Sequence, residues 1–376
     1  MECNERVLSF LAEWFDPHPQ IVKQYLLKYH CKTHEVEMKD IQTKRIFLKK
    51  TKIPSSLKEQ DFFVGASILL LSRDLKLIDY ADSVTRSLLT IEDERTVCII
   101  APTLYESLGD IAMLVEQAGF TLVDLKSICF DDIEGAETAV RVLRVDPREL
   151  ACPQPLVGMS FRGTDSIAAV KKVLEYSSFA GPGLLCSGTA DEALAYSDFF
   201  TSRRLKTAAT FEECSCCVIK PHAIKERMVG AIFNDVISRG FFVSAIAMFR
   251  LERAAAAEFL EVYDGVVPEY RQMVDEMCSG PVMAMEVRQT QQLLDSAERD
   301  GATRQEAVVE KFRAYAGPWD VNMAKELYSD TIRGKFGRDR VRNAIHCTDL
   351  PKDGVLEVEY FFKILEGWGS ETSKPD

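Results

Sequence analysis

The sequence predicts an α+β protein in which a small β-rich domain precedes two copies of one mixed domain. Residues 5–85 show strand-like alternation, and the following part of the chain runs twice through the same order of strand, helix and strand. Short motifs recur at matching places in the two runs, which is typical of a duplicated unit. A chain of 376 residues is also too long for one ordinary domain. We therefore predict domains at residues 1–90, 93–203 and 212–366.

The N-terminal domain is predicted from two hairpins. The stretch "EVEMKD" (35–40) alternates polar and apolar residues, "KRIFLKK" (44–50) does so in part, and "DIQT" between them supplies a turn. The stretch "ILLLSRDLKLIDY" (68–80) predicts a second hairpin that turns at "SRD". The polar stretch "SLLTIEDER" (87–95) predicts a linker to the next domain.

The two copies share strands, helices and helix ends. Both "TVCIIAP" (96–102) and "CCVIKP" (216–221) are apolar strands that end in proline, and each helix that follows stops at a glycine before a phenylalanine. "PLVGMSF" (155–161) then corresponds to "PVMAMEV" (281–287), and "FAGP" to "YAGP". Apolar residues recur at helical spacing in the first helix (Ile111, Leu114, Val115, Ala118) and in the second (Val229, Ile232, Phe233, Val236, Ile237).

One polar segment distinguishes the copies. The second copy runs from Gly317 to Phe361 through "TIRGKFGRDRVRNAIHCTDL", whereas the first passes from Gly181 to Phe199 with about 26 fewer residues. We interpret the missing residues as the segment that contains His346. The first copy also has alanine at position 101, where the second has Lys220, so we expect the polar chemistry to belong to the second copy.

Charge argues against general binding of nucleic acid, because the net charge is −12. Residues 1–90 nevertheless carry a net charge of +2, and "KDIQTKRIFLKKTK" (39–52) concentrates six basic residues. This stretch is either a solvated strand face or a contact with an acidic partner.

The chain has no run of eighteen apolar residues, and its N-terminus lacks a signal-peptide pattern, so we expect a soluble intracellular protein with no membrane partner. Eleven scattered cysteines favour reduced thiols. The group "CSCC" (214–217) lacks the C-x-x-C spacing of a zinc site, and we interpret it as a buried strand.

The second copy holds a set of polar residues suited to phosphate. A lysine at a strand end, arginines and an asparagine provide cationic and polar donors of fixed geometry, and no glycine-rich phosphate loop is present to do this work. A neutral histidine is a nucleophile near pH 7 if a partner fixes its tautomer. The candidates are Lys220, Arg313, Arg333, Asn343, His346 and Glu357.

Residue patterns alone leave two alternatives open for Glu357 and for His346. In "GVLEVEYFFKIL" (354–365), Glu357 shares a face with Phe361 and Ile364, which favours an inward carboxylate in need of a buried partner. A solvated carboxylate at the edge of that face is equally compatible with the spacing. His346, taken alone, is more typical of a satisfied core histidine.

At these positions the second copy resembles the nucleoside diphosphate kinase family. "VIKPH" resembles its I-K-P-D, "SGPVMAME" its S-G-P-V-V-A-M, "TIRGKFG" its T-I-R-G-x-F, and "RNAIHCTD" its R-N-x-x-H-G-S-D. The motifs occur in the family's order over residues 214–366.

The resemblance implies a ferredoxin-like βαββαβ core in each copy, with the first copy degenerate. It also implies a ping-pong transfer of the γ-phosphate from ATP or another nucleoside triphosphate to a nucleoside diphosphate, with Mg²⁺ as the cofactor. By the same resemblance His346 is the phosphorylated nucleophile and Glu357 orients its ring. The implied nucleotide-binding residues are Lys220, Tyr263, Arg313, Arg333, Asn343 and Thr348.

Four residues depart from the family pattern. Trp319 falls where the family has a phosphate-contacting threonine, and Arg340 where a small apolar residue faces the base. His222 replaces the aspartate of I-K-P-D, and Cys347 replaces the glycine after the nucleophile. The loop after "GPWD", which builds the family's hexamer, does not match either. These departures are compatible with weak activity and with a non-hexameric state.

The order of the three domains resembles family members associated with cilia and flagella. Their N-terminal module is similar to a pleckstrin-homology fold and occurs in axonemal proteins. The resemblance therefore implies tubulin and other axonemal proteins as partners, besides nucleoside di- and triphosphates, and a place in the cytoskeleton of the axoneme. Two readings stay open: an active kinase, or a structural pseudoenzyme or nucleotide sensor without turnover.

Overall fold

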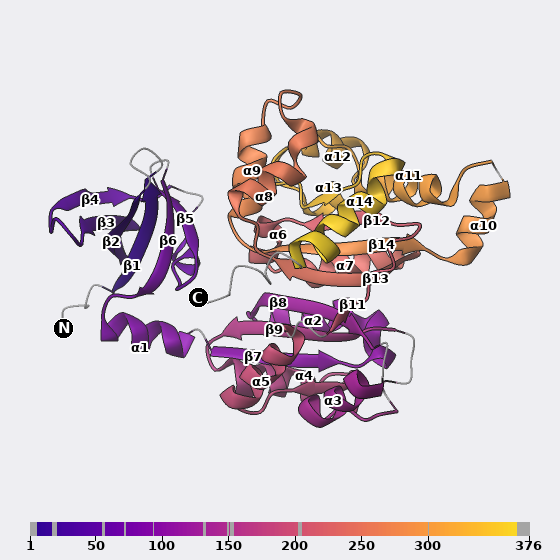
Figure 1. Cartoon of the computed structure of the whole chain (residues 1–376), viewed down its shortest axis with the longest axis horizontal. Helices are drawn as coiled ribbons and strands as arrows, with labels where there is room; N and C mark the ends of the chain where they lie inside the picture. Colours follow the sequence, from indigo (N-terminus) through magenta and orange to yellow (C-terminus); the bar gives the residue numbers. More distant parts are fainter. Residues whose placement is uncertain are drawn as a thin grey trace. The chain divides into compact units, whose positions relative to one another are not determined.

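The computed structural model describes residues 6–16, 21–54, 57–70, 73–92, 94–130, 133–148, 150, 154–201, 205–299 and 301–366. The chain folds into two compact units, Met1–Asp93 and Glu94–Asp376 (Figure 1). Both copies of the repeated sequence thus lie in one unit. Residue 203, the predicted end of the first copy, lies outside the described residues.

The first unit is an antiparallel sheet in the order β4-β3-β2-β1-β6-β5 with one helix. Leu8, Phe10, Leu27, Tyr29 and Leu75 are fully buried and belong to its core. The elements are β1 (Val7–Asp16), β2 (Ile21–His30), β3 (Glu35–Asp40), β4 (Ile46–Lys52), β5 (Ser67–Leu70), β6 (Arg73–Tyr80) and α1 (Ser83–Glu92).

Both predicted hairpins occur in this sheet, as β3 with β4 and β5 with β6. Part of the predicted "SRD" turn lies outside the described residues, and Arg73 already belongs to β6. The boundary between the two units, Asp93 and Glu94, falls inside the predicted linker 87–95, although α1 covers the start of this stretch and a strand begins at Glu94. Asp82 accepts a hydrogen bond from the Thr85 amide, a helix N-terminal signal that the polarity of the stretch concealed.

The second unit is built on one sheet in the order β10-β7-β9-β8-β13-β14-β12-β15, with β11 beside β8. Its strands are β7 (Glu94–Ile100), β8 (Thr121–Cys129), β9 (Leu156–Gly163), β10 (Leu184–Cys186), β11 (Lys206–Thr207), β12 (Ser215–Ile219), β13 (Phe241–Phe249), β14 (Val282–Gln289) and β15 (Ile345–Cys347). The four strands of each half follow the same order, so the halves meet back to back at β8 and β13 (Figure 1).

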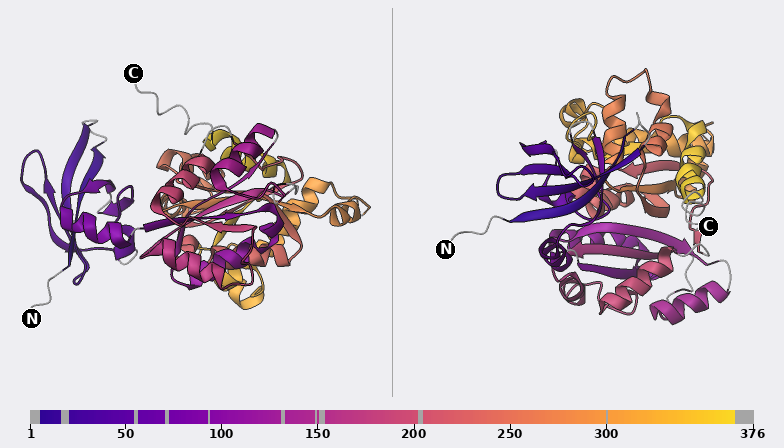
Figure 2. Two further views of the ribbon diagram at one scale, coloured as in Figure 1. Left: turned by 90° about the horizontal axis from the view of Figure 1, so that it is seen from below. Right: turned by 60° about the vertical axis from the view of Figure 1, so that its left-hand side comes forward.

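The described helices of this unit are divided unequally between the halves. The first half contains α2 (Leu108–Gln117), α3 (Ile133–Leu143), α4 (Ser166–Glu175) and α5 (Ala190–Thr201). The second contains α6 (Pro221–Lys225), α7 (Val229–Ser238), α8 (Arg253–Phe259), α9 (Tyr270–Cys278), α10 (Gln291–Arg299), α11 (Arg304–Ala316), α12 (Val321–Leu327), α13 (Ile332–Phe336) and α14 (Gly354–Glu359), which continues as a wider turn over Tyr360–Leu365. Helix α10 projects from the body of this unit (Figures 1 and 2). No described helix is long and apolar enough to cross a membrane.

The predicted helix patterns and helix ends are present. Ile111 and Val115 of α2, and Ile232 and Phe233 of α7, are buried in a core that both halves share. The glycines that follow these helices, Gly119 and Gly240, have φ values of +99° and +81°, which explains why glycine ends both. "CSCC" begins the buried strand β12, as interpreted, and Cys214, Cys216 and Cys217 are fully buried free thiols.

The strand of His346 is not missing from the first half, contrary to the interpretation from sequence. Leu185 pairs with Ile99 in β7 just as His346 pairs with Val218 in β12, so Leu185 holds the equivalent position. Two residues separate Gly181 from β10, whereas α12 and α13 lie between Gly317 and β15. The missing segment is therefore α12, α13 and the loops around them, and the histidine itself is replaced. Counting between two glycine and phenylalanine landmarks did not locate the deletion.

Helices α2 and α7 cross closely at the junction of the halves. A Cβ added to Gly230 would lie 2.3 Å from the amide nitrogen of Met113, so only glycine permits this approach. The Glu116 carboxylate accepts hydrogen bonds from the amides of Val229 (3.2 Å) and Gly230 (3.0 Å) at the start of α7. Burial raises the pKa of Glu116 to about 7, although these two bonds oppose the shift.

We expect Glu116 to make the stability of this unit decrease as pH rises from about 4.5 to about 7. Over that interval the unfolded chain loses the proton at the ordinary carboxyl pKa of 4.5, while the folded chain retains it. The folded state binds more protons, so a rise in pH favours unfolding by on the order of 3 kcal/mol in total. Outside this interval both states hold the same charge and the dependence ends.

Denaturant unfolding of the wild type and of Glu116→Gln at pH 5 and pH 7.5 measures this effect. The wild type should lose stability relative to the variant between the two values. Glu175→Gln, at an exposed carboxylate that ends α4, is the matched control and should follow the wild type. A constant difference between wild type and Glu116→Gln would contradict the expectation.

Candidate active site

His346 is held by a chain of hydrogen bonds that links β12, β15 and α14. The Cys216 amide donates to Thr348 Oγ1 (2.9 Å), and Thr348 Oγ1 donates to Glu357 Oε2 (2.9 Å). His346 Nε2 lies 2.8 Å from the same carboxylate oxygen. An ionised carboxylate only accepts, so Nε2 carries the proton and the lone pair of the neutral ring is on Nδ1. The structure therefore selects the inward alternative for Glu357.

Lys220 stands at the end of β12, before α6, with its side chain almost fully buried. Its Nζ donates to the Val341 carbonyl (2.8 Å), and its backbone amide donates to the Ala344 carbonyl (2.9 Å). Burial, and then the nearby charge of Arg333, lower the pKa of Lys220 to about 7. This ammonium has lost much of its hydration, and an anion beside it would favour its charged form.

Arg333 and Asn343 are buried polar residues with unused hydrogen-bonding groups. Arg333 is 6% exposed and donates from Nη1 to the Gly317 carbonyl (2.7 Å), but its Nε has no partner among the described residues. Asn343 is fully buried, and neither of its amide atoms has a partner there. Buried groups of this kind are normally satisfied, so both residues are suited to a polar ligand.

Arg313 and Tyr263 converge on Asp349 at the rim of the site. Tyr263 donates to Asp349 Oδ2 (2.6 Å), while Arg313 donates to the Asp349 carbonyl (2.9 Å) and pairs with its carboxylate (3.3 Å). Asp349 was not among the predicted site residues, although it ends the "RNAIHCTD" motif. In this state it engages two of the groups predicted to bind phosphate.

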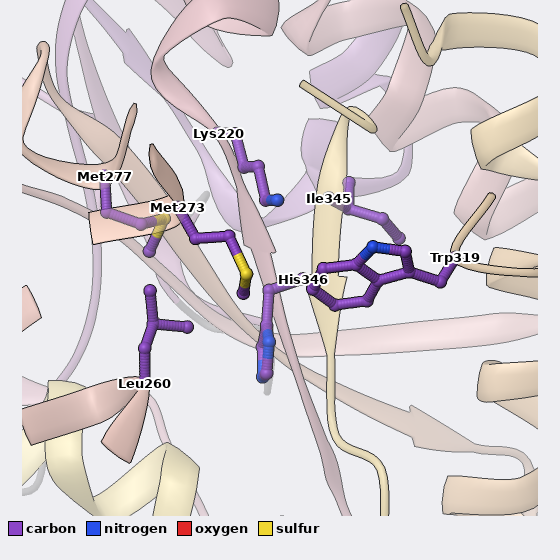
Figure 3. Close-up of a pocket in the computed structure, with 7 residues that line it drawn as sticks. All are labelled: Lys220, Leu260, Met273, Met277, Trp319, Ile345 and His346. Atoms are coloured by element: carbon purple, nitrogen blue, oxygen red, sulfur yellow. The ribbon is translucent and has the colours of Figure 1, made fainter. Parts of the chain in front are cut away.

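Trp319 lies across the centre of the site. It follows α11 and points its indole toward His346 and the other side chains that line a small pocket (Figure 3). The pocket is lined by Lys220, Leu260, Met273, Met277, Trp319, Ile345 and His346. Its volume of about 10 Å³ is the space of roughly one water molecule. The methionines and leucine of this wall were not predicted, because their spacing is that of ordinary core positions.

His222, which departs from the family pattern, supports the strand of His346. Its Nδ1 lies 2.8 Å from Glu276 Oε1, and its Nε2 accepts from the Ala344 amide (3.3 Å). Ala344 has a φ of +71°, a left-handed conformation that costs free energy in a residue with a side chain. Burial raises the pKa of Glu276, but hydrogen bonds from His222 outweigh it and hold that pKa below its usual value. His222 therefore stabilises the strained turn before β15.

Arg340 forms an ion pair at the entrance. Its Nη1 donates to Glu269 Oε1 (2.9 Å), and its Nε lies 3.9 Å from Asp320 Oδ2. Glu269 precedes α9 and Asp320 follows Trp319, so Arg340 connects the two sides of the entrance. No group of three or more potential metal-binding side chains occurs within the described ranges.

Comparison with known proteins shows similarity to one family over most of the chain. A model of the family described as "Nucleoside diphosphate kinase" matches residues 213–366. The mouse protein "Nucleoside diphosphate kinase homolog 7" is 35% identical over 95% of this chain and 93% of its own. The rat protein of that name is also 35% identical over the same shares.

Other relatives match a smaller share of the chain. Nucleoside diphosphate kinase of Aquifex aeolicus is 31% identical over 41% of this chain and 96% of its own. A crystal structure of the Aquifex aeolicus nucleoside diphosphate kinase covers the same shares, at 29% identity and a TM-score of 0.34.

We expect Glu357→Ala to release the tautomer of His346. Without the carboxylate that accepts the Nε2 proton, the neutral ring should populate both the Nδ1–H and the Nε2–H forms, whereas the wild type should hold Nε2–H. Nitrogen chemical shifts of the imidazole, above the pH at which the ring is protonated, distinguish these forms. Glu359→Ala, which removes a carboxylate paired with Lys363 on the same helix, is the control and should leave the shifts unchanged.

Proposed function

We propose, because the chain belongs to the nucleoside diphosphate kinase family, that its second copy transfers the γ-phosphate of a nucleoside triphosphate to His346 and then to a nucleoside diphosphate. The observation that carries this proposal is the bond between His346 Nε2 and Glu357. It leaves Nδ1 as a nucleophile in a ring that also lines a pocket with Lys220.

The chemistry requires two displacements at phosphorus. Nδ1 attacks the γ-phosphorus, the bond to the β–γ bridging oxygen breaks, and the diphosphate leaves with that electron pair. A β-phosphate oxygen of a second diphosphate then attacks the phosphohistidine, and the P–N bond breaks to restore His346. Glu357 accepts the hydrogen bond from Nε2–H in both steps, and its negative charge stabilises the positive charge of the phosphorylated ring.

Charge neutralisation falls to the buried cations and their polar neighbours. Lys220 and Arg333 both lie close to the Trp319 ring, and we assign them to phosphate oxygens. The side-chain amide of Asn343, which has no partner among the described residues, would add a further hydrogen bond. Arg313 and Tyr263 would exchange Asp349 for the nucleotide at the rim. Thr348 acts through Glu357, so we assign it a positioning role.

Mg²⁺ is the proposed cofactor. Magnesium commonly binds through substrate phosphates with one or two carboxylates, which fits a site that has Asp349 but lacks a cage of ligands among the described residues. When bound with the nucleotide, the ion would neutralise negative charge as it develops on the phosphates. Asp349 is the residue that would face it.

His346→Ala should abolish phosphorylation of the protein by radiolabelled ATP and Mg²⁺. Label on the wild type should be stable to alkali and labile to acid, as expected for a phosphorylated imidazole. His222→Ala is the comparison variant. The His222 ring accepts a hydrogen bond from the Ala344 amide, so its removal should lower the rate of labelling without abolishing it. Equal labelling of His346→Ala and the wild type would contradict the proposed nucleophile.

A second candidate function is structural. We propose that the chain is a component of the ciliary or flagellar axoneme, bound to doublet microtubules on their inner side, and that its first unit is a pleckstrin-homology-like module of the axonemal type. Tubulin and other axonemal proteins are the proposed partners. A structural pseudoenzyme or nucleotide sensor without turnover is the alternative to the kinase.

The basic stretch 39–52 supports a contact with an acidic partner. All six of its lysines and arginines are exposed, and β4 ends the sheet in the described part of this unit. Ile46 and Phe47 on β4 are 68% and 40% exposed, so the strand offers apolar surface among its positive charges. Lysines on an edge strand also discourage aggregation, which is the alternative explanation for their presence.

Charge reversal tests this contact. Replacement of Lys44, Arg45 and Lys49 by glutamate should lower the fraction of protein retained on isolated axonemes and weaken the salt dependence of release. Replacement of Lys171, Lys172 and Lys325 by glutamate makes the same change in charge at exposed positions of the other unit and should not. Full release of the wild type by detergent without salt would count against an axonemal component.

A further inference from the structure

Trp319 lines the pocket beside His346 and lies close to the buried cations of the proposed site. Its ring centre lies 5.7 Å from Lys220 Nζ and 5.9 Å from Arg333 Cζ, and 5.5 Å from the ring of Tyr263. The pocket beside His346 has a volume of about 10 Å³, too little for a phosphoryl group. Transfer to His346 therefore requires a wall of this pocket to move.

The walls differ in how freely they can move. Leu260, Met273 and Met277 are at most 2% exposed and belong to a packed core, so their displacement would open a cavity. Trp319 is partly exposed and lies in the irregular stretch between α11 and α12. Among these side chains, Trp319 is the one whose departure leaves the core intact.

Among the described residues, the closed arrangement leaves several buried polar atoms of the proposed site unsatisfied. They are Trp319 Nε1, Arg333 Nε and both amide atoms of Asn343, none of which has a partner among the described residues. Such groups destabilise a folded structure unless they are satisfied. Phosphate oxygens accept from guanidinium and amide N–H donors, so a bound polyphosphate would satisfy Arg333 Nε and the side-chain nitrogen of Asn343.

The stretch that carries Trp319 is also tethered at the entrance. Arg340 pairs with Glu269 and approaches Asp320, the residue after Trp319. The Arg340 side chain is half exposed, so these pairs are weak and salt-sensitive. They bias the stretch toward the closed position without fixing it there.

We propose that Trp319 is a displaceable plug that decides which phosphate compounds reach His346. A nucleoside di- or triphosphate replaces the contacts of the indole with several charge-assisted hydrogen bonds to Lys220, Arg333 and Asn343, and so drives the plug out. Orthophosphate makes too few of these bonds to do so. The proposal rests on the function assigned to His346 above and specifies what controls entry to that site.

Removal of the plug should raise the apparent affinity for nucleotide. Because a ligand binds only the open fraction, Trp319→Ala should lower the dissociation constant for Mg·ADP, measured by calorimetry on the full chain, by roughly tenfold or more. The rate of His346 labelling at low ATP should rise in parallel. Met323→Ala, at an exposed residue of the following helix, is the matched control and should change neither value.

Fluorescence tests the displacement itself. The chain contains three tryptophans, so Trp14→Phe with Trp368→Phe leaves Trp319 as the only one. Mg·ADP should increase quenching of Trp319 by acrylamide, whereas orthophosphate at the same concentration should leave it unchanged. Arg340→Gln, which removes the tether, should increase quenching before any ligand is added.

The outcomes separate the plug from the proposed reaction. Binding of Mg·ADP with no change in Trp319 quenching overturns the plug, as does a Trp319→Ala variant whose affinity is unchanged or weaker. Equal displacement by orthophosphate overturns the selectivity. If Mg·ADP exposes Trp319 and binds Trp319→Ala more tightly, but neither protein acquires label on His346, the plug stands and the phosphohistidine reaction fails.

Discussion

The arrangement of the second copy depends on one carboxylate that is largely removed from water. Glu357 is 19% exposed and is satisfied by His346 on β15 and by Thr348, which in turn accepts from the β12 backbone. A buried charge that loses its partners is strongly destabilising, so these contacts constrain one another. Glu357 must keep its hydrogen-bond partners. This one requirement links the pairing of β15 with β12, the position of α14 and the orientation of the imidazole. The histidine that we propose as the nucleophile is therefore also a structural residue.

The first copy satisfies a different requirement. It keeps the strand order of the second copy but has Leu185 where the second has His346, and it lacks the helices that carry Arg333 and the stretch of Trp319. Its β8 lies against β13, and its α2 covers the apolar face of α7. Without it, the second copy would expose a sheet edge and buried residues such as Ile232 and Phe233 to water. The replacement of the histidine and the retention of the fold are thus compatible, because the interface requires only shape and hydrophobic surface.

Patterns in the sequence predicted those parts of the fold that depend on local periodicity. The duplicated strands, the helices with Ile111 and Ile232 on their buried faces, and the glycines that end them follow from spacing alone. The helix α1 within the linker stretch was not predicted, because it is short and polar and because its start depends on a single residue, Asp82. The sequence could not predict that both copies join in one sheet, because the close approach of α2 to α7 depends on tertiary contacts at Gly230. Likewise, the polar residues of the proposed site were predicted from sequence motifs. The position of Trp319 across the pocket was not, because it depends on the conformation of the segment between α11 and α12.

Electrostatics explains why a site closed by an indole still suits a phosphate. Lys220 and Arg333 are buried beside each other, and the pKa of Lys220 falls to about 7 as a consequence of burial and of that neighbour. An aromatic ring offers such cations only a weak attraction compared with an anion in the same place. A polyphosphate would supply the missing negative charge, raise the pKa of Lys220 and draw a proton onto it from solvent. Binding of a polyphosphate, protonation of Lys220 and displacement of Trp319 would then favour one another. Each of the three makes the other two more favourable in free energy.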